Sequence, residues 1–422
     1  ASDIAQRLVA KALPYSTKVS AIMTKDVITV DASESLDLVL ELMIQHNVRC
    51  IPVTDAGLIK GLITTTELLQ NSALEAVYLI RDIKNAQSVD ELSELSKRTT
   101  GIFSSMLDAD MQPHVVQRTM SKIADSFCDR IIKMTITKLG PAPCAFAFVA
   151  AGSLARCEIQ LLSDQDNAII TERPLNTAEA KYFSMLAQDV CTALDRCGYP
   201  LCQGNYMAAN PKWRVSYQDW CEYYNKWISD TSSKSLLNSL VFLDIRLLFG
   251  DEFLVNKLKQ HLLNTVKGNT RFLALLCEVS TAVAPPLGTF RQFVLTKDGS
   301  NSKSLNIKSQ AVNLIIELAR LYALGANSTA TDTITRLNDA TKADLLRQED
   351  CRELTEAYDF LNTVRLRHQL DAIKKHQALS NSIVPSELTQ FERNHLRDAF
   401  RIISRHQVAA LIRFAPSRGI FG

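Results

Sequence analysis

Apolar residues follow two different spacings along the chain, and the change of spacing separates its parts. The run from Cys144 to Ala151 combines aromatic and β-branched residues over a length too short for a helix, so it predicts a buried strand. From residue 74 to 139, and again beyond residue 254, apolar residues recur every three or four positions, which predicts helices. The chain should therefore combine a mixed α/β region with a helical bundle that follows it.

A turn of small residues follows the predicted strand. Gly152 and Ser153 form this turn, and a second predicted strand opens shortly afterwards with Asp164, Gln165 and Asp166. Since alternate side chains of a strand share a face, the two aspartates should project together while the glutamine points away. Mg²⁺ usually takes one or two protein carboxylates and completes its shell with water and substrate phosphates. Both aspartates are therefore candidate catalytic metal ligands.

The turn itself suits a polyphosphate. Glycine lets backbone N–H groups approach closely, Ser153 adds a hydroxyl, and Arg156 can offer a planar charged fork. A phosphate-binding turn beside two carboxylates is suited to metal-assisted nucleotidyl transfer. The alternative is an Asp-x-Asp that only bonds to the backbone at a strand edge. The Gly-Ser turn and the two strand-like flanks favour the functional interpretation.

The pattern G-S-x-x-R-x-E, followed by S-D-Q-D-N-A-I-I, resembles the nucleotidyltransferase family (domain of unknown function 294 type) found C-terminal to CBS domains, a relative of the PII-protein uridylyltransferase catalytic domain. Segments 194–200, 202–214 and 242–251 are similar to later blocks of that family, and nearly the whole chain is covered. The resemblance implies a polymerase-β-like catalytic domain at 141–254 and a helical substrate-binding domain at 255–422. It implies a nucleoside triphosphate (NTP) substrate, Mg²⁺, and an acceptor hydroxyl, on a protein by similarity to the uridylyltransferase. The nucleotide-binding residues that it implies are Gly152, Ser153, Arg156, Asn167, Asn210, Lys212 and Arg214.

Two departures from the family pattern affect the expected site. Ala155 stands where the family commonly has a second glycine, which changes the turn without removing a ligand. The expected strand from Tyr199 to Asn210 contains no Asp or Glu, although relatives carry a third carboxylate on a following strand. Asp244 is the substitute candidate, as base or third ligand; its competing interpretation is a helix residue paired with Arg246 or another neighbour. Similarly, the segment 210–214 is either a pocket wall or a loop anchored by packed tryptophans.

Residues 17–72 are similar to one CBS repeat, ending in Gly61-Leu-Ile-Thr-Thr-Thr-Glu67. The resemblance implies that an adenine nucleotide binds here through Val27, Thr64 and Glu67, although glutamate replaces the family's aspartate. The alternative is a repeat that serves only for dimerisation. Residues 1–16 resemble the tail of a preceding repeat, and 73–140 are expected to link the sensor to the catalytic domain. Because the helical segment 36–44 is apolar nearly all round, we predict a homodimer held through residues 17–70.

Composition narrows the class of protein. The 422 residues are 46% hydrophobic and 22% charged, which is ordinary for a globular protein, and the net charge of +2 gives no general attraction to nucleic acid or membrane. The ten cysteines show no metal-ligand spacing and are interpreted as reduced core thiols. No window reaches the length of a spanning helix, and we expect a cytoplasmic protein without nucleic-acid or membrane partners.

Two other functional interpretations stay open at this stage. The chain can be a nucleotide-sensing protein that no longer turns its ligand over, or an enzyme that modifies a small molecule rather than a protein. A basic helix face repeating every four residues, at Arg393, Arg397, Arg401 and Arg405, is either solvated or directed at phosphates. The alternative side chains for donating hydrogen bonds to phosphate are Arg365, Arg367 and His368.

Overall fold

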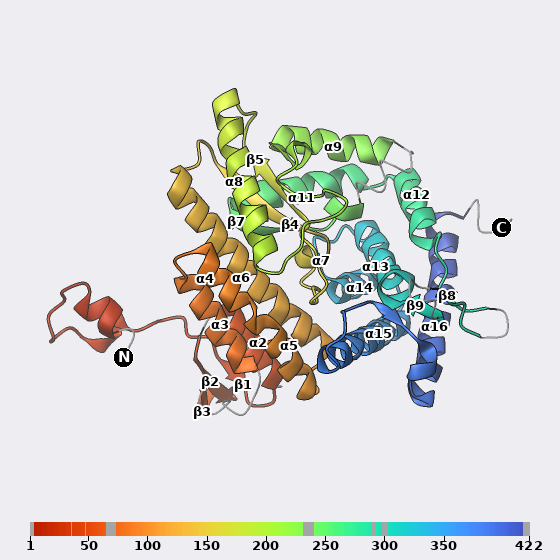
Figure 1. The fold of residues 1–422 in the computed structure, drawn as a ribbon, viewed down its shortest axis with the longest axis horizontal. Helices are drawn as coiled ribbons and strands as arrows, with labels where there is room; N and C mark the ends of the chain where they lie inside the picture. The colour runs from red at the N-terminus through yellow and green to blue at the C-terminus, as the bar shows by residue number, and fades with distance from the viewer. Residues whose placement is uncertain are drawn as a thin grey trace. The chain divides into compact units, whose positions relative to one another are not determined.

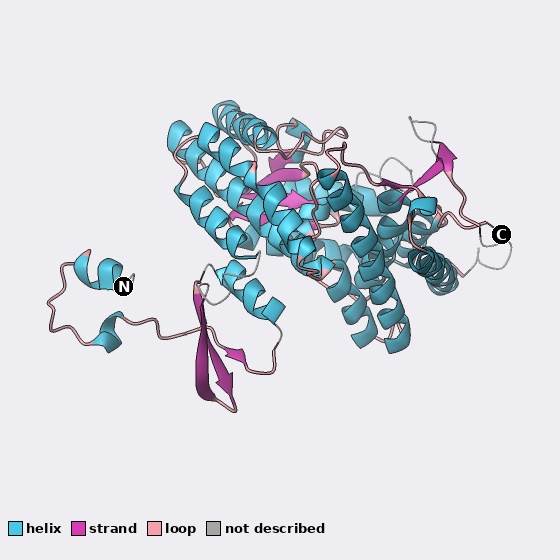
Figure 2. Cartoon of the chain, turned by 60° about the horizontal axis from the view of Figure 1, so that its bottom comes forward, coloured by secondary structure: helices cyan, strands magenta, loops and turns pink. Residues whose placement is uncertain are grey.

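The structure is a computed structural model that describes residues 4–34, 36–46, 48–64, 73–230, 240–288, 292–297 and 303–416 (Figure 1). The chain forms two compact units, residues 1–74 and residues 75–422. Figure 2 shows the strands as small groups among many helices. The predicted fold class is confirmed: an N-terminal α/β region, a second region built on a mixed sheet with helices, and a C-terminal helical region.

The N-terminal unit contains a three-stranded sheet in the order β1-β2-β3. The first two strands are parallel, and a two-residue turn joins the second to the antiparallel third. Ala56 and Gly57 in this turn both have positive φ, as a tight type I′ hairpin requires. The elements are η1 (Ile4–Val9), α1 (Val19–Ile22), β1 (Val30–Asp31), α2 (Leu36–His46), β2 (Cys50–Asp55) and β3 (Leu58–Thr64).

The second unit is built on a four-stranded sheet in the order β6-β5-β4-β7. The central strand β4 pairs antiparallel with both neighbours, and β5 pairs parallel with β6. All six residues of β4 are buried, because helices cover both faces of the sheet. This explains the continuous apolar run in the sequence. The strands are β4 (Phe146–Ala151), β5 (Asn167–Thr171), β6 (Arg214–Ser216) and β7 (Ile245–Gly250).

The helices of the catalytic region pack on opposite faces of this sheet. Phe146 contacts Phe183 of α8 at a ring-centroid distance of 5.2 Å, while Ala147 and Val149 join the core that contains Trp220 of α9. The helices are α3 (Ala73–Asn85), α4 (Val89–Ser96), α5 (Arg98–Asp108), α6 (Pro113–Leu139), α7 (Gly152–Ala155), α8 (Thr177–Arg196), η2 (Pro211–Trp213), α9 (Tyr217–Ser229) and α11 (Glu252–Val266).

The C-terminal part is a helical bundle with a small sheet in the order β10-β9-β8. Its apolar residues continue the core of the catalytic sheet without a break. The elements are α12 (Thr270–Thr281), β8 (Thr296–Lys297), β9 (Lys303–Asn306), η3 (Lys308–Val312), α13 (Asn313–Gly325), α14 (Thr333–Lys342), α15 (Gln348–Lys374), β10 (Ser382–Ile383), η4 (Pro385–Glu387) and α16 (Gln390–Phe414). The catalytic sheet and the bundle are therefore one folding unit.

The expected strand from Tyr199 to Asn210 is not observed. Only Leu201 forms an isolated bridge, with Gln165, and the parallel partner of β5 is β6 at residues 214–216. The segment before β6 is instead a loop, whose backbone pairs at separate points, such as Asn167 N–H with the Tyr206 carbonyl at 3.0 Å. Apolar and aromatic residues anchor this loop instead of forming a strand.

Candidate active site

Gly152 lies where the end of β4 meets the two aspartates. Its φ is +55°, and a Cβ atom at this position would lie 2.6 Å from Oδ2 of Asp166. Real Cβ atoms do not approach so closely, and glycine adopts such a positive φ at no steric cost. The glycine therefore permits the Asp166 carboxylate to lie directly against the turn.

The segment from Asp164 to Asp166 has the predicted alternation of side chains. Gln165 is buried, and its Nε2 donates to the carbonyls of Cys191 and Tyr199 at 2.9 and 2.8 Å. The two flanking aspartates are only partly buried. The regular strand β5 begins at Asn167, later than expected, yet the bridge at Gln165 keeps the extended geometry.

Cys202 completes a cluster with the two aspartates. One ligand atom from each of Asp164, Asp166 and Cys202 lies within 4.8 Å of the others. Burial and the charge of Asp164 raise the pKa of Asp166 to about 6, and burial together with Asp166 raises the pKa of the thiol to about 12. Two carboxylates held close together and partly buried form a site that a cation would stabilise. The sequence analysis missed this cysteine, because it has no ligand spacing in the sequence.

A cationic side chain of the helical bundle interacts electrostatically with the same aspartates. Lys308, the first residue of η3, is partly buried, and burial and Arg365 lower its pKa while Asp164 and Asp166 oppose that shift. Burial lowers the pKa of Arg365 to about 10, and its Nε donates to Asn381 Oδ1 at 2.7 Å. No role was predicted for this lysine from the sequence.

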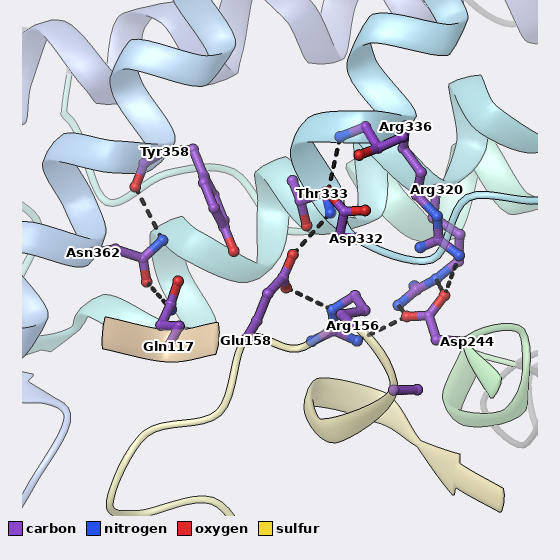
Figure 3. Close-up of polar contacts among 12 residues, drawn as sticks. Gln117, Arg156, Glu158, Asp244, Arg320, Asp332, Thr333, Arg336, Tyr358 and Asn362 are labelled. Atoms are coloured by element: carbon purple, nitrogen blue, oxygen red, sulfur yellow. Dashed lines mark hydrogen bonds and ion pairs between the residues drawn. The ribbon is translucent and has the colours of Figure 1, made fainter. Parts of the chain in front are cut away.

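Arg156 and Asp244 belong to a buried ion-pair network instead of the aspartate cluster (Figure 3). Arg156 Nη1 donates to Asp244 Oδ2 at 2.7 Å, and its Nε donates to Glu158 Oε2 at 2.7 Å. Arg320 and Arg336 also reach Asp244, at 2.7 and 2.6 Å. Asp244 is fully buried, and these charges keep its pKa well below its usual range.

Three guanidinium groups therefore occupy the carboxylate that was the candidate third ligand. Asp244 directly precedes β7, at the same end of the sheet as Gly152, but the structure does not bring it into the cluster of Asp164 and Asp166. The competing interpretation was a helix residue paired with Arg246 or another neighbour. Asp244 instead lies just before a strand and pairs with arginines that are distant in the sequence, while Arg246 pairs with Asp125 at 2.8 Å. In the same way, the fork of Arg156 is occupied by protein carboxylates.

Three family models match stretches of the chain. The model described as "Putative nucleotidyltransferase DUF294" matches residues 97–234, the "Putative nucleotidyltransferase substrate binding domain" matches 270–414, and the "CBS domain" matches 19–73. The chain belongs to this CBS-associated nucleotidyltransferase family. No curated protein matches the chain. Within the described residues, none of the helices has the length and apolar character needed to cross a membrane.

The other implied nucleotide-binding residues of this family member organise the loop before β6. Asn167 is buried, and its Oδ1 accepts from Ala208 N–H at 2.8 Å. Asn210 caps η2 through Lys212 N–H, and Arg214 Nη1 donates to the carbonyls of Ala208 and Ala209. The Lys212 ammonium is exposed and lies 4.2 Å from the Trp213 ring centroid. The structure thus places three of the four as supports of the loop.

The remaining predicted residues lie in α7 and in the CBS region. Ser153 is partly buried in α7, next to Gly152. In the CBS region, Val27 is exposed, Thr64 is partly buried at the end of β3, and Glu67 lies outside the described residues.

The basic face of α16 is largely bound to its surroundings. Arg393 donates to the Leu388 carbonyl, Arg401 pairs with Asp398, and Arg405 pairs with Glu353. Arg397 lies over the Phe293 ring at 4.9 Å. These contacts favour a structural role for the face, whereas Arg365 shares the surroundings of Lys308.

Proposed function

We propose that this protein is a metal-dependent nucleotidyltransferase that transfers a nucleoside monophosphate from an NTP to an acceptor hydroxyl and releases pyrophosphate. The observation that carries the proposal is the pair Asp164 and Asp166, close together and partly exposed, beside a glycine turn and within electrostatic reach of Lys308. Two carboxylates facing a cationic side chain are suited to hold a metal-bound polyphosphate between them.

The residues present fit a divalent cation. Burial and, next, the charge of Asp164 raise the pKa of Asp166, so a bound cation would stabilise its ionised form, and Gly152 leaves the room that this carboxylate needs. When bound, Mg²⁺ would stabilise the charge that develops on the attacking and leaving oxygens. Asp164 and Asp166 would hold it, and their partial exposure leaves positions for substrate oxygens.

The other side chains position the substrate. Backbone N–H groups at Gly152 and Ser153 bind phosphate oxygens, and the Lys308 ammonium neutralises polyphosphate charge from the opposite side. Arg156 and Asp244 do not bind the substrate directly. Their ion pairs hold the residues after α7 against helices α13 and α14 and so position the phosphate-binding turn. The acceptor class that we propose is a protein hydroxyl, as in the related uridylyltransferase.

The test is transfer from each of the four α-³²P-labelled ribonucleoside triphosphates in the presence of Mg²⁺ and cell extract. We expect one triphosphate to label a macromolecule, and Asp164→Asn and Asp166→Asn to abolish labelling. Asp189→Asn is the matched control, since this surface carboxylate pairs with Lys138 on a different helix. Labelling that survives in both site variants would refute the proposed nucleotidyltransferase activity.

A second function, nucleotide sensing without turnover, has one observation in its favour. Asp244 is locked by three arginines, so the site lacks the third carboxylate expected of an active enzyme. Equilibrium binding separates the two functions: NTP binding that requires Asp164 and Asp166, with no labelled product from any extract, supports the sensor.

For the CBS region we propose regulation by an adenine nucleotide and a homodimer through residues 17–70. Within this unit, exposed apolar side chains lie on β3, at Leu58, Ile59 and Leu62, while Val39 and Met43 of α2 are buried. The strand is thus the better candidate for the contact than the helix. Light scattering at tens of micromolar, with and without AMP or ATP, tests the dimer, and a monomer in both conditions would refute it.

A further inference from the structure

Cys202 is held against the carboxylate pair by its own loop. Its side chain is hydrogen-bonded to Asp166, and the backbone of Tyr206 bonds to the sulfur. The Cys202 carbonyl accepts from Asn205 N–H at 2.9 Å, and its own N–H points to Met207 Sδ at 3.4 Å. The thiol is 9% exposed, so its direction is fixed by packing as well as by these bonds.

The geometry of the cluster matches the coordination shell of one ion. Metal–oxygen and metal–sulfur bonds of about 2.1 and 2.3 Å allow two ligands of one ion to lie up to about 4.4 Å apart. The three ligand atoms of Asp164, Asp166 and Cys202 already lie within 4.8 Å of one another. Small side-chain movements would therefore bring all three onto a single cation.

The carboxylate that would otherwise complete the shell is occupied. Asp244 gives its oxygens to Arg156, Arg320 and Arg336, and its release would leave these buried cations without their counter-charge. Cys202, in contrast, bonds only to groups at the site and its loop that metal binding would leave in place. The thiol is thus the available third ligand.

We propose that Cys202 Sγ is a direct third ligand of the cation held by Asp164 and Asp166, which lets the site bind thiolate-accepting divalent ions such as Zn²⁺ and Co²⁺ as well as Mg²⁺. On binding, the S–H proton passes to solvent and a metal–sulfur bond forms, so each bound ion releases a proton. Thiolate ligands favour zinc-like ions, whereas carboxylate and water alone suit Mg²⁺. This inference rests on the proposed cation site but needs no nucleotide turnover.

The test is titration of the full chain with Co²⁺, followed by sulfur-to-metal charge-transfer absorption in the near ultraviolet. We expect a band that saturates at one equivalent and is lost in Cys202→Ser, with at least about tenfold weaker Co²⁺ affinity, since even an indirect partner of a metal ligand is worth that much. Cys221→Ser is the control, because this partly buried thiol lies on α9, outside the cluster. It should keep the band.

Two outcomes separate this proposal from the proposed function. Co²⁺ binding to the unmodified chain without a charge-transfer band overturns the sulfur ligand but leaves the carboxylate site and the nucleotidyltransferase intact. A band that persists in Cys202→Ser overturns it as well. Cys202→Asp gives the converse check: it should lose the band and bind Mg²⁺ more tightly than the unmodified chain, because a third carboxylate replaces the thiol.

Discussion

Replacing Asp166 by asparagine should stabilise the metal-free protein at high pH while it removes a ligand of the proposed cation site. The pKa of this carboxyl is about 6 instead of 3.8, mainly because it is buried and next because Asp164 is close. A difference of this size corresponds to at most about 3 kcal/mol, and less to the extent that solvent screens the pair. Charging Asp166 therefore costs the folded state that free energy.

The direction in which folding stability changes with pH follows from proton linkage. The folded state holds a proton on Asp166 up to about pH 6, whereas the unfolded chain releases it near pH 4, so folding stability falls as pH rises between these values. We expect Asp166→Asn and the unmodified protein to be equally stable near pH 4. Above pH 6.5 the variant should be more stable by up to about 3 kcal/mol.

Urea denaturation in EDTA, followed by tryptophan fluorescence, measures the difference in free energy of unfolding between Asp166→Asn and the unmodified protein. The three tryptophans, Trp213, Trp220 and Trp227, are all buried in the catalytic core. Glu179→Gln is a control of opposite sign, because Arg173 lowers the pKa of Glu179 to about 2 and stability should be lost at neutral pH. An Asp166→Asn protein that is less stable than the unmodified protein at pH 8 would refute the reasoning.

Three further predictions concern the neighbouring parts of the site. Asp244→Asn should lower the free energy of unfolding by about 3–5 kcal/mol, since it leaves buried arginines unpaired, while the affinity for Mn²⁺, followed by electron paramagnetic resonance, stays unchanged; a lost Mn²⁺ site would instead make Asp244 a ligand. Gly152→Ala should lose Mn²⁺ affinity through the contact with Asp166, whereas Gly198→Ala, which also has a positive φ, of +87°, but open space at Cβ, should keep it. Lys308→Met should weaken NTP binding, measured by calorimetry, by about 1.5–3 kcal/mol, which is the contribution of a hydrogen bond to a charged group. The control is Lys303→Met, at an exposed lysine, and equal NTP affinities of the two variants would contradict the role of Lys308.

The sequence predicted the parts of the fold that depend on local pattern. The apolar run at 144–151 became the buried strand β4, and the alternation at Asp164 and Asp166 put both carboxylates on one face. It could not predict the partners of Asp244, because Arg320 lies 76 residues further along the chain. Cys202 escaped notice for the same reason: only the folded loop brings a thiol to the two carboxylates.

The strand expected at 199–210 shows a different limit. Its aromatic and apolar residues satisfy a strand pattern, but they pack individually, as Tyr206 does on Trp213 at 5.7 Å, while the backbone pairs at separate points. Local preference for extended structure is then realised as an anchored loop, because tertiary contacts decide the pairing.

The ion pairs around Arg156 also bear on how the chain can be divided. The matched families separate a catalytic part ending at residue 234 from a substrate-binding part starting at 270. A cut between these residues would leave Arg156 and Glu158 in one piece and Arg320 and Arg336 in the other, each with buried charges that lack their counterparts. Such pieces should recombine as complementing fragments and should not behave as independent modules, so exchanging the bundle between relatives requires that both sides of this charge network be transferred together.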